Sequence, residues 1–134
     1  MSDYNSQIIA EFRANEGRVG GTFAGAPLLL LHSTGARTGA DRVSPMMYQQ
    51  VEGGWAVFAS KGGAPDNPSW YHNLIAHPDA SVEIGTETVA VTAREATGEE
   101  RSTIWEEQKR RYPGFADYER KTSRTIPVMV LQPR

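Results

Sequence analysis

The sequence predicts an α+β fold in which a mostly antiparallel sheet, or a small β-barrel, carries helices on its outside. Three observations predict it. Apolar segments of strand length recur along the chain, and turn residues join most of them as hairpins. The sustained strand–helix alternation that would favour a parallel sheet is missing. The chain has 134 residues, 39% of them apolar and 22% charged, which is enough for one core and one domain.

Composition excludes several classes of protein. The net charge of −2 and the isoelectric point near 5.9 argue against a nucleic-acid binder, whose domain carries a basic surface. Without cysteine the chain has no disulfide, thiolate nucleophile or cysteine-ligated metal. No apolar run approaches the roughly 20 residues of a membrane span. The first residues also lack the pattern of a secretory signal, so we expect a cytoplasmic protein.

The N-terminal part is predicted to be a short amphipathic helix over residues 4–15, followed by a glycine-rich connector. Three apolar side chains share one face of this helix by the i, i+3, i+4 rule: Ile8, Ile9 and Phe12. We therefore divide the chain into an N-terminal helix and connector, residues 1–26, and a main domain, residues 27–134.

Six segments of the main domain have the length and composition of strands: 27–33, 42–51, 55–60, 80–84, 87–93 and 126–131. The first is continuously apolar, which favours a buried central strand. Pro45 in the second indicates an edge strand or a bulge. The pairs Gly53-Gly54 and Gly85-Thr86 predict the turns of two hairpins.

Three helices are predicted in the main domain. The first runs over residues 67–76, with Asn67 as its cap. The second ends near Tyr112, and Thr97 and Glu100 have the spacing of a capping box at its start. A short helical segment follows at residues 115–121.

One cluster of candidate functional residues lies at residues 33–39 together with Arg42. Its hydroxyls, glycines and two arginines suit an anion, because glycine lets backbone N–H groups approach and guanidinium groups grip phosphate or carboxylate. The spacing fits neither a P-loop nor a dinucleotide-binding fingerprint. A polar turn with solvated arginines remains the alternative interpretation.

Two further clusters follow along the chain. Ser60 and Lys61 end a strand and open a Lys-Gly-Gly loop, where bare backbone could approach a flat, anionic ligand; a flexible surface loop is the alternative. The helix start at residues 67–73 offers free N–H groups to an anion. Trp70 and Tyr71 are adjacent there, so we expect one to be core and the other to face a ligand.

Other patterns are weaker. His72 and His77 lack metal-ligand spacing and are expected on a helix surface, His32 is expected to be a buried strand residue, and no metal site is predicted. No Gly-x-Ser-x-Gly elbow supports a serine hydrolase. Three aromatic residues recur near the C-terminus and form either core or a pocket wall: Tyr112, Phe115 and Tyr118.

Four segments in this order resemble the deazaflavin-dependent (coenzyme F420-dependent) nitroreductase family of actinobacteria. They read STGARTGADRVSPMMY, AVFASKGGAPDNPSWYHNL, HPDASVEI and ERSTIWEEQKRRYPGFADYERKTSRTIPVMVL, and the resemblance covers residues 27–134. It implies a split β-barrel with flanking helices. It also implies a reductase that passes a hydride from reduced F420 to a small organic acceptor: a quinone, an enone or a nitro compound.

The resemblance also implies residue roles. The residues matched to cofactor binding are Ala36, Arg37, Thr38, Arg42, Val43, Ser44, Pro45, Met46, Met47, Phe58, Ala59, Ser60, Lys61, Ser69, Trp70, Tyr71, His72 and Asn73. Ser60, Tyr112 and Tyr118 are matched to catalysis, and Tyr112, Phe115 and Tyr118 to the acceptor. F420 carries a phosphate and a polyglutamate tail, which suits the cations of the first two clusters.

Two departures from the family bear on function. Phe115 stands where nitroimidazole-reducing relatives carry tyrosine, which argues against nitroimidazole reduction. The N-terminal segment is short and acidic beside membrane-seeking relatives, so peripheral membrane attachment has no support. The alternatives are an FMN-dependent oxidoreductase on the same barrel, or a non-catalytic protein that binds F420 or a lipid. A monomer and a homodimer are both compatible with the sequence.

Overall fold

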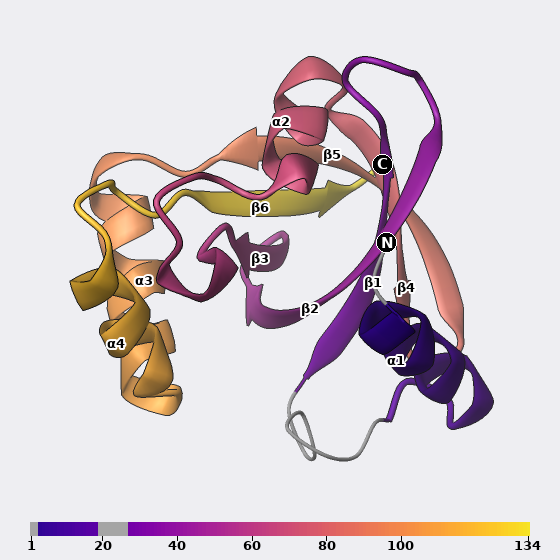
Figure 1. Ribbon diagram of the computed structural model, residues 1–134, viewed down its shortest axis with the longest axis horizontal. Helices are drawn as coiled ribbons and strands as arrows, with labels where there is room; N and C mark the ends of the chain where they lie inside the picture. Colours follow the sequence, from indigo (N-terminus) through magenta and orange to yellow (C-terminus); the bar gives the residue numbers. More distant parts are fainter. Residues whose placement is uncertain (1–2, 19–26) are drawn as a thin grey trace.

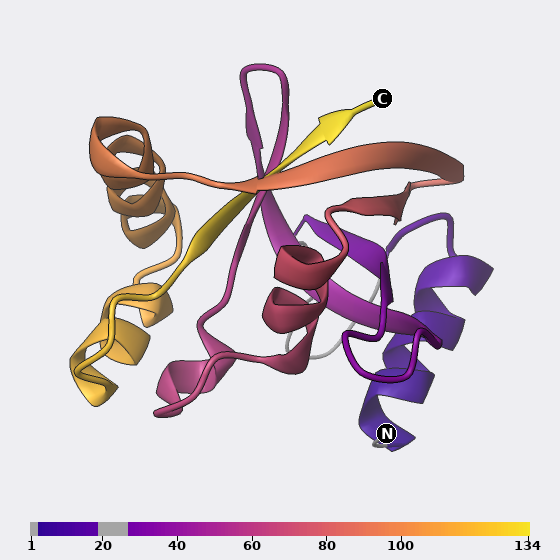
Figure 2. The same ribbon diagram turned by 90° about the horizontal axis from the view of Figure 1, so that it is seen from above.

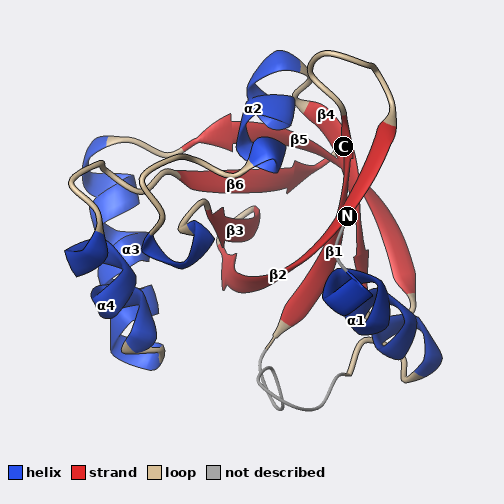
Figure 3. Cartoon of the chain, in the orientation of Figure 1, coloured by secondary structure: helices blue, strands red, loops and turns tan. Residues whose placement is uncertain are grey.

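A computed structural model describes residues 3–18 and 27–134 and consists of a closed, six-stranded antiparallel barrel with helices around it (Figures 1 and 3). The strands are β1 (Leu28–Thr34), β2 (Asp41–Val51), β3 (Gly54–Phe58), β4 (Asp79–Ile84), β5 (Glu87–Glu95) and β6 (Val128–Pro133). They follow the order β1-β2-β3-β6-β5-β4 around the barrel. The predicted α+β barrel is confirmed, although most of the glycine-rich connector, residues 19–26, lies outside the described residues.

The helices are α1 (Asp3–Ala14), α2 (Ser69–Ala76), α3 (Gly98–Arg111) and α4 (Gly114–Lys121), with a 3₁₀ turn, η2, at Lys61–Gly63. Each predicted helix is present with small shifts at its ends. Within the described residues, no helix combines the length and the apolar character that a membrane crossing requires.

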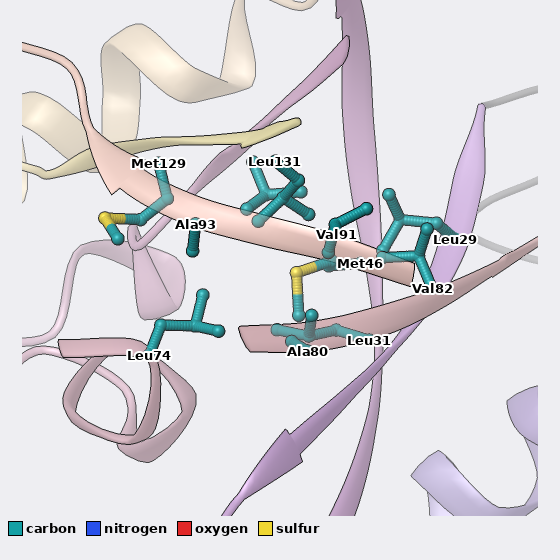
Figure 4. Close-up of a cluster of buried hydrophobic side chains, with 11 residues drawn as sticks. Leu29, Leu31, Met46, Leu74, Ala80, Val82, Val91, Ala93, Met129 and Leu131 are labelled. Atoms are coloured by element: carbon teal, nitrogen blue, oxygen red, sulfur yellow. The ribbon is translucent and has the colours of Figure 1, made fainter. Parts of the chain in front are cut away.

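The barrel interior is filled by one side-chain face of the strands, as period-two alternation requires (Figure 4). Leu29, Leu31, Val82 and Val91 are fully buried there. Leu74 of α2 belongs to the same cluster, so α2 packs against the barrel core. This places the start of α2 beside the strand ends that carry the candidate residues.

Helices α3 and α4 cover the outer face of β3 and β6. Trp105 is only 1% exposed and lies in a second apolar cluster with Phe115 of α4. Phe58 of β3 and Val130 of β6 complete the contact, and they alternate with the inward-facing residues of their strands. Figure 2 shows these two helices together on one side of the barrel, away from α1.

Helix α1 covers the outer face of β1. Phe12, 1% exposed, packs with Ile8 and Ile9 against Leu28 and Leu30. Polar contacts beside this cluster tie the helix to β4: Arg13 donates to Glu83 at 3.1 and 2.7 Å, and the Glu83 carboxylate lies 2.5 Å from Nε2 of His32. His32 is therefore a half-buried member of an ion network on the barrel wall, not the buried histidine that the sequence predicts.

Strand β2 changes partner along its length. Residues 41–47 pair with β1, whereas residues 48–51 pair with β3. Within the described residues, the first part of β2 has no strand partner on its other edge. Pro45 lies in this part, opposite Leu30 of β1, so the edge character that the proline predicts holds locally although the barrel is closed.

The predicted Asn67 cap is wrong, and Thr97 is the cap of α3 as predicted but forms no capping box. Hydrogen bonds to arginine side chains explain both differences. Pro68, not Asn67, precedes α2, because the Asn67 side chain accepts a hydrogen bond of 2.6 Å from Arg124. Thr97 does precede α3, but its side chain makes no cap bond, and the Glu100 carboxylate binds Arg94 at 2.6 and 2.7 Å. In each case an arginine replaces the local partner.

Candidate functional site

The first predicted cluster forms a tight turn between β1 and β2. Gly35 N–H donates to Ala40 at 2.7 Å, and Gly39 N–H, with φ of 71°, donates back to Gly35 at 2.9 Å. A Cβ on Gly35 would lie 2.8 Å from Oγ1 of Thr38. The turn is therefore compact, and it leaves Ala36, Arg37 and Thr38 exposed at its tip.

Asn73 on α2 is hydrogen-bonded to this turn. Its Oδ1 accepts a hydrogen bond of 3.0 Å from the backbone N–H of Ala36, and its Nδ2 donates to Oγ of Ser33 at 3.3 Å. Asn73 is only 7% exposed. Both ends of its amide are thus used within the protein, and the residue joins the first cluster to the third.

The second cluster continues from β3 into η2. Ala59 and Ser60 are buried, while Lys61 is exposed with φ of 47°, a left-handed conformation that residues with a Cβ rarely adopt. Gly63 packs so closely on α4 that a Cβ there would lie 2.9 Å from the Tyr118 carbonyl oxygen. The loop is therefore in direct contact with the helix that carries the predicted acceptor wall.

Arg124, which the sequence analysis did not single out, lies at the centre of this loop. Its guanidinium donates to the carbonyls of Ala59, Ser60 and Ala64 at 3.1, 3.0 and 3.0 Å and to the Asn67 side chain at 2.6 Å. No local pattern in the sequence marks Arg124, because its partners lie about 60 residues earlier in the chain.

Residues 42–47 and 59–61 diverge from a common point. Tyr48 pairs with Val57, after which β2 and the β3 extension separate, and the Ala59 N–H donates to Pro127 instead. Figures 1 and 2 show α2 between the β1–β2 turn and the η2 loop. The three predicted clusters are thus neighbours along one side of the barrel.

Several predicted cofactor residues point their side chains into the protein. Met46 lies in the barrel core and Phe58 in the α3–α4 cluster, while Val43 and Met47 pack with the α1 cluster. These four offer a ligand their backbone rather than their side chains. Three others remain at least partly accessible along β2: Arg42, Ser44 and Pro45.

The start of α2 differs from the expectation that one of its two aromatic residues is core. Trp70 and Tyr71 are both half-buried against the barrel cluster. The Tyr71 hydroxyl donates to Glu95 at 2.8 Å, and burial, together with this bond and the Glu95 charge, raises the pKa of Tyr71 to about 12. Ser69 and His72 are exposed.

The three aromatic residues predicted as core or pocket wall, Tyr112, Phe115 and Tyr118, differ in their burial. Phe115 is 8% exposed, with its ring centroid 5.6 Å from that of Phe58, 6.1 Å from Trp105 and 5.2 Å from Tyr118. Tyr112 and Tyr118 are half-buried. Phe115 is therefore a core residue, and the two tyrosines are the accessible members of this group.

Glu119 fixes α4 against α3. Trp105 Nε1 and Lys109 Nζ donate to it at 2.7 and 3.0 Å. Burial alone would raise the pKa of Glu119, but these two hydrogen bonds and the nearby positive charges bring it below its ordinary value. The carboxylate is thus held ionised between the helices, and it sets the position of the Tyr118 turn.

Five arginine and lysine side chains of the described residues make no hydrogen bond or ion pair: the three predicted cations, Lys121, and Arg18 just after α1. Most basic residues are occupied, for example Arg94 by Glu100 and Arg110 by Glu107. In the parts of the chain that the structure describes, Arg37, Arg42 and Lys61 make no side-chain hydrogen bond or ion pair. Lys121 is likewise unpaired among the described residues, and its aliphatic stem lies over Gly63, beside Lys61. No motif in the sequence marks Lys121 as a site residue.

A cavity of about 790 Å³ lies elsewhere, between the end of β2 and α3. Its lining includes none of the predicted site residues. It carries the carboxylates of Glu52, Glu99, Glu100, Glu106 and Glu107. Arg110 also lines the cavity, and three of the glutamates are paired with cations, but Glu52 and Glu99 have no cationic partner among the described residues. The lining therefore has a net negative charge, which disfavours an anionic cofactor there.

Comparison with known proteins identifies relatives over most of the chain. A family model described as F420H(2)-dependent quinone reductase matches residues 6–133. An F420H(2)-dependent quinone reductase of Mycobacterium tuberculosis is 39% identical over 132 residues, 93% of this chain and 87% of that protein.

Two solved structures are similar as well. One, described as an F420-H2 dependent reductase, is 43% identical with a TM-score of 0.72, and the match covers 79% of this chain and 94% of that one. Another, described as a domain-swapped dimer, is 39% identical with a TM-score of 0.74, and the match covers 95% and 93%.

Proposed function

Because this chain belongs to the F420H(2)-dependent quinone reductase family, it is an oxidoreductase with reduced F420 as its cofactor, and we propose that it reduces a quinone at the three joined clusters. The resemblance seen in the sequence and the expected cofactor are thereby confirmed. The identity of the acceptor and the roles of individual residues are our proposals.

The residues present fit the cofactor. Its phosphate and polyglutamate tail need cations that are not already neutralised, and Arg37, Arg42 and Lys61 are unpaired within the described residues. Asn73 joins the turn that carries Arg37 to α2, and Arg124 joins the loop that carries Lys61 to Asn67, just before α2. This combination of unpaired cations on connected segments is the observation that carries the proposed site.

In this arrangement the two arginines and Lys61 would hold the anionic parts, while the bare backbone of residues 59–61 and the accessible edge of β2 would lie along the ring. When bound, reduced F420 supplies a hydride to the acceptor. The chain's own residues bind the cofactor and orient it toward the acceptor.

Reduction of a quinone to a hydroquinone takes up one hydride and one proton, so one proton must be supplied in addition to the hydride. Tyr118 and Tyr112 are the partly exposed tyrosines of the α3–α4 region, and the backbone of Tyr118 contacts the loop at Gly63. We assign proton donation to one of them, with solvent restoring the proton. Tyr71 is excluded from this role, because its hydroxyl already donates to Glu95. Ser60 is assigned to hydrogen bonding with the ring or the acceptor.

A quinone is favoured over the other acceptors for two reasons. The M. tuberculosis relative is described as a quinone reductase. Phe115, where nitroimidazole-reducing relatives carry tyrosine, is enclosed by Phe58, Trp105 and Tyr118 and offers no hydroxyl. An enone remains chemically similar enough to be the second acceptor class to test.

The experiment is a fluorescence titration of F420 into the purified protein, followed by turnover of reduced F420 with a soluble naphthoquinone, an enone and a nitroimidazole. Binding of F420 with fastest turnover on the quinone is expected. Binding of FMN in place of F420 would overturn the proposed function in favour of a flavin oxidoreductase. Tight F420 binding without turnover of any acceptor would favour a carrier.

The oligomeric state is part of the same proposal. Since a 39% identical solved structure is described as a domain-swapped dimer, we expect this chain to form a homodimer. Light scattering in solution would give twice the 14.7 kDa chain mass. A mass of one chain at all concentrations would contradict the dimer and leave the site assignment unaffected.

A further inference from the structure

We infer that Arg124 is a positioning residue of the cofactor site, an inference that rests on the function proposed above. Arg124 shapes the loop of residues 59–67 so that Lys61 is presented to the anionic part of the cofactor. It does so from beneath the loop, through backbone carbonyls.

The geometry of the contacts supports this role. The guanidinium reaches Ala64 through Nε, Ala59 and Asn67 through Nη1, and Ser60 through Nη2. These acceptors span the whole stretch from the end of β3 to the residues just before α2. Arginine suits this task because its planar group offers five N–H donors in a fixed fork. The loop is therefore wrapped around one side chain.

Apart from its packing on α4 at Gly63, the loop has few other hydrogen bonds. Its own backbone contributes the bonds from Gly63 N–H to Ser60 and from Ala64 N–H to Lys61, at 2.9 and 3.1 Å. Lys61 is held at φ of 47°, which needs support from its surroundings. Arg124 binds the carbonyl directly before Lys61 and the carbonyl three residues after it. Loss of the guanidinium would let Lys61 return to a common backbone conformation.

The charge of Arg124 has a second effect. In the described parts of the chain, no carboxylate lies within ion-pair distance of Arg124; its partners are three carbonyls and one amide oxygen. The positive charge is therefore not cancelled, and it adds to the potential around Lys61. A tail of carboxylates or a phosphate at this place is attracted by both groups.

The test compares Arg124→Lys with Arg101→Lys. Arg101 is a matched control, because its Nε and Nη2 also donate to a buried backbone carbonyl, that of Ile126, but it does not touch the loop. We expect R124K to raise the Kd for F420 by about tenfold, since the loss of a charge-assisted hydrogen-bond fork has this size. R101K is expected to keep the wild-type Kd. Thermal unfolding without cofactor measures any general loss of stability.

Three further measurements separate positioning from plain structural support. Guanidinium ion added at about millimolar concentration to Arg124→Ala should restore part of the F420 affinity, whereas the same addition should not help Lys61→Ala. In the K61A background, R124K should raise the Kd less than it does alone, because the residue it positions is gone. Asn67→Ala, which removes one acceptor and keeps the arginine, should raise the Kd several-fold.

The outcomes that would overturn the role of Arg124 differ from the outcome that would overturn the proposed function. Wild-type F420 affinity in R124K overturns the inference, and so does an equal effect of R124K with and without Lys61. If R124A does not fold, R124K and N67A still decide the question. Failure of the wild-type protein to bind F420 would instead overturn the proposed function.

Discussion

The backbone N–H of Ala36 donates a hydrogen bond of 3.0 Å to Oδ1 of Asn73, which joins the arginine-bearing turn to the start of α2. Since Asn73 is buried, Asn73→Ala should leave this N–H and the Ser33 hydroxyl without partners. We expect a loss of about 1–3 kcal/mol in the free energy of unfolding, together with a several-fold rise in the Kd for F420. Urea unfolding and F420 fluorescence measure the two effects.

Ser33→Ala is the matched control for Asn73→Ala. It removes the bond from Nδ2 but keeps the bond to Ala36. S33A should therefore cost less stability and leave F420 affinity near the wild-type value. An unchanged Kd in N73A would contradict the view that α2 positions the turn.

The unpaired cations predict a charge-dependent affinity. Arg42→Ala and Lys61→Ala should each raise the Kd for F420 by about tenfold, and added salt should weaken wild-type binding more than it weakens binding to either variant. Arg110→Ala is the control, because this arginine is already occupied by Glu107. If the three variants bind alike in fluorescence titrations, the site lies elsewhere.

The accessible tyrosines predict a split between kcat and cofactor affinity. Replacing the proton-donating hydroxyl, by Tyr118→Phe or Tyr112→Phe, should lower kcat for the quinone about a hundredfold without a change in the F420 Kd. Tyr71→Phe should leave kcat unchanged, since that hydroxyl is bound to Glu95. Steady-state kinetics decide this, and full activity in both the Y118F and Y112F variants would move proton donation to solvent or to Ser60.

Phe115 predicts a stability effect in the α3–α4 cluster. Phe115→Ala should remove contacts to three neighbouring rings and cost about 3–5 kcal/mol in the free energy of unfolding. Phe115→Leu should cost clearly less, because it fills most of the volume. Chemical denaturation distinguishes the two, and a cost below about 1 kcal/mol for F115A would mean that this cluster is not close-packed.

Glu83 predicts an acid-dependent weakening of the α1 contact. The hydrogen bond from Arg13, opposed by burial and helped by His32, lowers the pKa of Glu83 below its ordinary value of 4.5. The folded state thus binds fewer protons than the unfolded state near this pH. The stability that Glu83 contributes is present above about pH 4.5 and is lost as the pH falls through its lower, folded-state pKa.

Glu83→Gln should flatten the acid side of a stability–pH curve measured by urea unfolding. At neutral pH it should cost no more than about 1 kcal/mol, because Arg13 is half-exposed. Glu87→Gln, at the exposed start of β5, is the control. Identical acid limbs in E83Q and wild type would show that another group controls acid unfolding.

Much of the fold was predictable because its signals are local. The apolar alternation, the Gly53 and Gly85 turns and the Pro113 break are each visible within a few residues, and the strands and helices follow them. The Asn67 cap and the Thr97–Glu100 capping box do not form, because Arg124 binds the Asn67 side chain and Arg94 binds the Glu100 carboxylate. Arg124 lies 57 residues from Asn67, so a short window of sequence carries no trace of their contact. Arg94 is only six residues from Glu100, but the contact depends on how the chain turns from β5 into α3.

At the candidate site, too, the features set by residue type were predictable and those set by tertiary contacts were not. The exposed cations, the glycines and the tyrosines were recognisable from residue type. The supporting roles of Asn73 and Arg124 were not, because they depend on which carbonyls and N–H groups the folded chain brings near. The inward direction of Met46 and Phe58 likewise became clear only with the strand register.

The placement of α1 has a practical outcome for anyone who shortens this protein. Leu28 and Leu30 face outward from the barrel wall and are kept from water by Ile8, Ile9 and Phe12. A truncated protein that begins at β1 would expose these two leucine side chains to solvent. Truncated molecules would associate through this exposed apolar surface. A dimer formed by the truncated protein would therefore give no information about the oligomeric state of the intact chain.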